Sequence, residues 1–130
     1  MAVSNIKAVF RNNVQNVWNI VTSFENPGWR SDLSKIEILN VNRFIEYTKD
    51  GYATTFTVTL AEPFSRWEFD MENSNMSGHW VGTFTEKDGY TEIDFTEYVT
   101  AKKLIMKPFV KAFLKKQQAL YVSDLRKVLE

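Results

Sequence analysis

The chain has 130 residues, of which 44% are hydrophobic and 15% aromatic, and its 16 basic residues balance 16 acidic ones. This length is that of one domain, residues 1–130, with enough apolar side chains to bury a substantial core. A nucleic-acid-binding protein normally carries a basic excess, so the zero net charge argues against that class. The sequence contains no cysteine, which excludes disulfides and thiolate chemistry.

Neither a signal peptide nor an integral membrane segment is expected. Residues 1–7 contain no apolar run of the length that a signal peptide requires. No segment approaches the roughly 18 consecutive apolar residues of a transmembrane helix. A cytoplasmic protein is the default expectation.

The chain is predicted to open with a strand and a short helix. Residues 6–11 alternate in polarity, which indicates a strand whose even-numbered side chains point inward. Asn12 or Asn13 is a suitable N-cap for a helix that continues to about Phe24. Pro27 and Gly28 then end the helical pattern.

After one further helical turn at residues 29–33, six strands are expected in a meander. Their apolar side chains alternate with polar ones, and turn residues separate them. The expected strands are residues 35–41, 43–48, 52–60, 66–72, 77–85 and 91–100. Two Lys-Asp-Gly-Tyr segments, beginning at Lys49 and Lys87, favour hairpins, because Asp-Gly tolerates the positive φ of a type I′ turn.

Residues 102–130 are predicted to form one long amphipathic helix. At 100° per residue a broad apolar arc forms, with Lys111, Lys115 and Gln118 on the opposite side. Gln117 and Asp124 lie near the middle of the apolar arc. The arc comprises Ile105, Phe109, Val110, Ala112, Phe113, Leu114, Leu120, Tyr121 and Val128. The predicted fold is therefore α+β, with this helix covering the inward face of an antiparallel sheet.

Lysines cluster at the start of this helix. The solvated side of the helix is the simplest interpretation of the cluster, and a membrane-surface or acidic-partner role is the alternative. The lysines are Lys102, Lys103, Lys107, Lys111, Lys115 and Lys116.

Several segments follow one another in a distinctive order. A helix at residues 13–22 leads to an elbow, Phe24-Glu25-Asn26-Pro27-Gly28-Trp29. Gly78-His79-Trp80-Val81-Gly82-Thr83-Phe84 forms a late strand, Gly89-Tyr90-Thr91 a hairpin, and Lys107-Pro108-Phe109 the entry to the last helix. In this order, the segments resemble the SRPBCC (START-related, helix-grip) superfamily, particularly its small polyketide cyclase/dehydrase-like members.

The resemblance implies a helix-grip fold. In that fold a curved antiparallel sheet of six to seven strands surrounds a long C-terminal helix, and two short helices follow the first strand. It also implies an apolar cavity between sheet and helix that holds a lipid, polyketide, steroid or similar molecule. It implies no particular reaction, since many members only bind or carry ligands.

Glu97 differs from the other strand carboxylates because it shares its parity with Phe95 and Val99. A carboxyl group that faces an apolar interior has a raised pKa, which suits a general acid or base. Alternatively, a β-bulge shifts the register and Tyr98 points inward instead. Asp124 and Gln117 form a second pair, which either binds a ligand or satisfies a polar group at the edge of the core.

Four further residues have predicted places in the fold. His79 is the only histidine, so neither a His-rich metal site nor a Ser-His-acid triad with a spare histidine is available. It is expected on the face opposite Trp80, outside the cavity, in a surface or structural role, and acid–base chemistry is the alternative. Gly82 either allows close approach of the helix or marks a bend in its strand. Trp18 and Trp29 are expected to pack the short helices at the cavity mouth.

The candidate ligand-binding residues combine the inward aromatic side chains with these polar groups. They are Phe56, Val58, Trp67, Phe69, Trp80, Phe84, Phe95, Glu97, Phe109, Phe113, Gln117, Leu120 and Asp124. No cofactor or metal is expected, because there is no P-loop, dinucleotide fingerprint or zinc-ligand spacing.

Three functions remain open. The first is binding or transport of a small hydrophobic ligand (a lipid, polyketide or aromatic compound) without catalysis. The second is a cyclase, dehydratase or hydrolase that uses Glu97 or Asp124 as acid or base, with Tyr47, Tyr98 or Tyr121 orienting the substrate. The third is a protein-interaction module that uses the lysine-rich helix face. The sequence indicates no oligomeric state.

Overall fold

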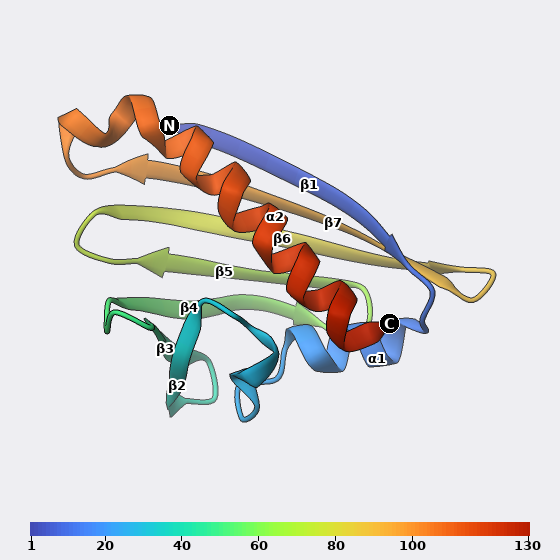
Figure 1. The fold of residues 1–130 in the computed structure, drawn as a ribbon. Helices are drawn as coiled ribbons and strands as arrows, with labels where there is room; N and C mark the ends of the chain where they lie inside the picture. Colours follow the sequence, from blue (N-terminus) through green and yellow to red (C-terminus); the bar gives the residue numbers. More distant parts are fainter.

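The computed structural model describes residues 1–130 and consists of an antiparallel sheet crossed on one face by a long helix (Figure 1). The strands are β1 (Ala2–Phe10), β2 (Leu33–Asn40), β3 (Arg43–Thr48), β4 (Ala53–Glu62), β5 (Arg66–Glu72), β6 (Met76–Lys87) and β7 (Tyr90–Ala101). Their order in the sheet is β1-β7-β6-β5-β4-β3-β2, so the last six form a meander and β1 pairs with β7. The predicted α+β fold, with a curved seven-stranded sheet around a C-terminal helix, is confirmed.

The helical elements are α1 (Val14–Val21), η1 (Pro27–Trp29), η2 (Leu104–Phe109) and α2 (Val110–Leu129), of which η1 and η2 are 3₁₀ helices. Asn13 caps α1, as predicted, because its side chain accepts a hydrogen bond from the Asn16 backbone amide at 2.8 Å. No helix is both long and apolar enough to span a membrane.

The two Lys-Asp-Gly-Tyr segments form different turns. Asp88 and Gly89 both have positive φ (54° and 83°), as a type I′ turn requires. At the first segment only Gly51 has positive φ (83°). The type I′ prediction is therefore wrong at that hairpin, where β3 ends at Thr48 and β4 begins at Ala53, leaving a longer connection.

The C-terminal helix is shorter than predicted. Residues 104–109 are a 3₁₀ helix, and α2 begins only at Val110. Pro108 explains the difference, because proline lacks a backbone N–H and its ring clashes with the carbonyl of the residue four positions earlier. An α-helix therefore cannot run unbroken from residue 102.

The predicted buried face of α2 also needs correction. Gln118, assigned to the polar side, is only 5% exposed, whereas Phe113 and Leu120 of the predicted apolar arc are substantially exposed. The Ser4 hydroxyl donates to Gln118 Oε1 at 2.7 Å, and Gln118 Nε2 donates to the Ser4 carbonyl at 3.1 Å. These bonds satisfy the buried amide and fix the rotation of α2 over β1, the strand on which it mainly packs.

Candidate functional site

A cavity of about 770 Å³ lies between α2 and the inner face of the sheet. Of its 37 lining residues, 21 are hydrophobic, so the walls are mostly apolar, as in small-molecule sites generally. The β3–β4 and β5–β6 turns, η2 and the first turns of α2 also contribute to its lining. In Figure 1 these segments gather at one end of the sheet, around the N-terminal end of α2.

Nine of the thirteen predicted ligand-binding residues line this cavity, and they come from both the sheet and the C-terminal helical segment. They are Phe56, Trp67, Phe69, Trp80, Phe95, Glu97, Phe109, Phe113 and Gln117. Six of these nine residues were predicted from the alternation along the strands, and the other three from the periodicity of the C-terminal helix.

The other four predicted residues lie outside the wall. Val58 packs into the core beside a bulge in β4, and Phe84 is covered by Trp18 of α1, with ring centroids 5.1 Å apart. Leu120 points away from the sheet because α2 is rotated relative to the prediction. Asp124 is buried, and its Oδ2 accepts two hydrogen bonds from Ser31.

Gly82 makes room for an aromatic side chain. A Cβ atom at this position would lie 2.4 Å from the Trp80 ring and 3.0 Å from Phe95. The close neighbours are aromatic side chains of the sheet, and not the helix that was predicted to approach here. The glycine allows the Trp80 indole to lie flat on the sheet and stack against Phe69, 4.7 Å away between centroids.

Glu97 points into the cavity. The pairing of β7 with both β1 and β6 runs through Glu97 without a register shift, so no bulge turns Tyr98 inward. The Glu97 carboxyl has no hydrogen-bond or ion-pair partner in the protein. Burial raises its pKa to about 7, and the nearby positive charge of Arg30 only partly opposes this.

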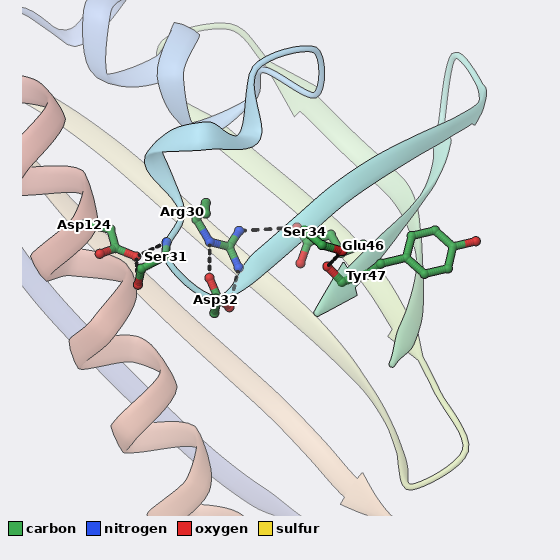
Figure 2. A network of polar contacts seen from close by, with 7 residues as sticks. All are labelled: Arg30, Ser31, Asp32, Ser34, Glu46, Tyr47 and Asp124. Carbon is green, nitrogen blue, oxygen red and sulfur yellow. Dashed lines mark hydrogen bonds and ion pairs between the residues drawn. The ribbon is translucent and has the colours of Figure 1, made fainter. Parts of the chain in front are cut away.

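Arg30 forms the centre of a polar cluster with Asp32, Glu46, Glu97 and Tyr121 (Figure 2 shows Arg30 between Asp32 and Glu46). Its guanidinium donates to both Asp32 carboxylate oxygens at 3.1 Å and to Glu46 Oε2 at 3.3 Å. It also lies over the Tyr121 ring, 4.8 Å from the centroid. One positive charge thus faces three carboxyl groups.

Burial and the charges within the cluster also shift the pKa values of Arg30, Glu46 and Tyr121. Burial acts to lower the pKa of Arg30, but Glu46, Tyr121 and Asp32 more than offset it, so Arg30 stays charged. Burial raises the pKa of Glu46 and of Tyr121, and the charge of Arg30 opposes both shifts. The one cation of the cluster is therefore already paired with Asp32 and Glu46.

Asp124 holds the loop that carries Arg30. Its Oδ2 accepts from the backbone amide and the hydroxyl of Ser31, both at 2.8 Å (Figure 2). The bonds tie α2 to the segment between η1 and β2. Asp124 therefore positions the neighbouring Arg30 and does not face the cavity itself.

Sequence reasoning missed Arg30 and Glu46. Arg30 lies in an irregular segment with no periodicity to indicate its direction. Glu46, in contrast, shares its strand parity with the buried Phe44, so the argument that identified Glu97 would also have identified Glu46. Of the predicted tyrosines, Tyr121 lines the cavity, whereas Tyr47 bonds Glu37 and Tyr98 is exposed.

Three further predictions concern residues around the cavity. His79 lies outside it, on the outer face of the sheet, where its ring nitrogens contact Asp70 at 2.7 Å and Glu68 at 2.9 Å. Trp29 lines the cavity and packs against Tyr121, with ring centroids 5.2 Å apart. Trp18 packs α1 onto β6 and is absent from the wall, so its predicted place is wrong.

Residues 4–130 match the model of the protein family described as polyketide cyclase / dehydrase and lipid transport. A search of curated proteins finds no match. The matched family extends over almost the whole chain, including every residue of the cavity wall.

Solved structures share the fold at low sequence identity. A START superfamily protein from Mycobacterium smegmatis has a TM-score of 0.85 at 13% identity, covering 98% of this chain and 96% of its own. A conserved protein from Geobacillus kaustophilus has a TM-score of 0.84 at 13% identity, with 98% and 95% coverage. DynU16, from the dynemicin biosynthetic locus, has a TM-score of 0.80 at 16% identity, with 98% and 46% coverage.

Proposed function

Because the chain belongs to the polyketide cyclase / dehydrase and lipid transport family, we propose that it binds and carries a small hydrophobic molecule in the cavity under α2. The observation that carries the proposal is an apolar cavity of about 770 Å³ with an unpartnered carboxyl group, that of Glu97, in its wall. Apolar walls with a few fixed polar groups are typical of ligand sites.

The charges of the polar cluster define the class of ligand. Arg30 is already paired with Asp32 and Glu46, so it offers little to an incoming carboxylate. Glu97 has free acceptor atoms and is negative or neutral near pH 7. We therefore favour a hydrophobic ligand with one hydrogen-bond donor, either a hydroxyl or an amine, over a fatty acid.

Thermal unfolding with three ten-carbon probes tests this proposal, with decanol below its solubility limit and decylamine and decanoate below their critical micelle concentrations. Decanol and decylamine are expected to raise the melting temperature, while decanoate has little effect, because ligands that bind only the folded state stabilise it. Glu97→Gln should bring the melting temperatures measured with decylamine and with decanoate closer together. Glu92→Gln, on the exposed outer face, is the matched control and should leave the order unchanged. Absence of stabilisation by all three probes would overturn ligand binding at this site.

An enzymatic role is the second candidate, and the pKa of Glu97, about 7, favours it. A general acid or base works best when its pKa lies near the working pH. In that case Glu97→Gln abolishes turnover of a polyketide-like substrate and leaves binding of decanol in place. Native mass spectrometry of the freshly purified protein distinguishes the two functions, since a carrier retains an unchanged ligand and an enzyme converts it.

A further inference from the structure

Large apolar side chains are exposed beside the cavity mouth. Leu104 and Ile105 of η2 are 77% and 79% exposed, and Phe109 is 68% exposed. Phe113, one helical turn further along, is 46% exposed and on the same face as Phe109. Phe109 and Phe113 also line the cavity, so this apolar surface is continuous with its wall.

The segment that carries these side chains is positively charged. Residues 101–123 contain six lysines and no acidic residue, although the whole chain is neutral. The remaining residues therefore carry 10 basic groups (16 − 6) against all 16 acidic ones. All six lysines are exposed, and only Lys102 forms an ion pair, with Glu72 at 3.5 Å.

We propose that this mouth patch, comprising Leu104, Ile105, Phe109, Phe113 and the six lysines, docks the protein on the surface of a membrane that contains anionic lipids. Exposed apolar side chains insert at the boundary between head groups and acyl chains, and lysines beside them attract anionic head groups. A second copy of the chain fits poorly, because pairing two patches would bring twelve lysines together.

The patch lies where docking would bring the opening of the cavity against the membrane. With Phe109 and Phe113 against the bilayer, the cavity opens toward the lipid phase and a hydrophobic ligand can enter or leave without crossing water. Exchange of a ligand with the bilayer depends on the proposed ligand binding. The docking itself depends only on the exposed residues, so the two can fail separately.

Co-sedimentation with vesicles tests the proposal. The protein is expected to bind vesicles of phosphatidylcholine with ~30% phosphatidylglycerol, to bind pure phosphatidylcholine vesicles much less, and to dissociate as salt is raised. Lys107→Glu with Lys111→Glu should weaken binding at least ~30-fold, since each lysine near an anionic surface contributes a factor of roughly five. Lys87→Glu with Lys127→Glu, at exposed sites outside the patch, is the matched charge control and should bind almost normally.

The apolar side chains are tested in the same assay. Leu104→Ser with Ile105→Ser should also lose vesicle binding, while Ile38→Ser with Val41→Ser should retain it. Ile38 and Val41 are comparably exposed, at 51% and 90%, but lie in β2 and the turn after it. Circular dichroism confirms that each variant is folded. Equal binding to both kinds of vesicle, no binding to either, or a requirement for an acidic protein partner or a second copy would overturn the proposal.

Discussion

Glu97 links the stability of the fold to pH. Its pKa is about 7 in the folded protein and 4.5 for an unperturbed glutamate, so the unfolded chain releases this proton more readily. As pH rises from about 4.5 to about 7, the free energy of unfolding therefore falls, by up to about 3 kcal/mol. Outside this range Glu97 does not make the free energy of unfolding depend on pH. Glu97→Gln should therefore stabilise the protein at pH 8 and change little at pH 4. Urea unfolding across this range measures the effect. Glu92→Gln should keep the wild-type slope, and identical slopes for wild type and Glu97→Gln would contradict the assignment.

The positive charge of Arg30 compensates the negative charges of the Asp32 and Glu46 carboxylates. Arg30→Met leaves two mostly buried carboxyl groups without a cation, which should destabilise the fold by about 3 kcal/mol. Adding Asp32→Asn and Glu46→Gln to the same chain should recover much of this loss, because the uncompensated charges are then removed. Chemical denaturation of the single and triple variants measures the loss of stability and its recovery. A triple variant no more stable than Arg30→Met would show that packing, not charge, dominates.

At the scale of the elements, alternation along the strands predicted the sheet well. Polarity with a period of two identifies an inward face even when the residue is acidic, as at Glu97. The prediction of the C-terminal helix was less accurate. Pro108 delays the start of α2 to Val110. Gln118 is buried because it bonds Ser4, a residue 114 positions away in the sequence. The irregular segment around Arg30 has no period at all, so its role depends on tertiary contacts that the sequence alone does not reveal.

Gly82 shows how one strand position shapes the cavity wall. Gly82→Ala would place a methyl group 2.4 Å from the Trp80 ring, so the indole must move or the strands must separate. We expect a loss of stability of about 2 kcal/mol, typical of overpacking, and an altered near-ultraviolet circular dichroism spectrum from the displaced tryptophan. Gly28→Ala is the control, because no atom lies within 4 Å of its Cβ position. Equal effects of the two substitutions would contradict this account.

At the scale of the whole molecule, α2 is anchored unevenly. Near its C-terminal end Arg126 donates to the Val9 carbonyl and Asn12 to the Leu129 carbonyl, both at 3.1 Å, and Leu125 is fully buried. Its N-terminal end has no side-chain cap and follows the exposed η2. Val110 and Leu114 are buried at that end, but it lacks polar anchors of this kind, so we expect the end that borders the cavity mouth to be the more weakly held one.

Hydrogen exchange should reveal this asymmetry. Amides in residues 102–113 are expected to exchange faster than those in residues 118–128, the reverse of a helix that frays from a free C-terminus. Decanol should slow exchange in the first segment and in the β3–β4 turn, because ligand contacts stabilise the closed mouth, and leave residues 118–128 unchanged. Arg126→Met should accelerate exchange only in residues 118–128. Faster exchange in residues 118–128 of the wild type would place the opening at the other end of α2, away from Phe109 and Phe113.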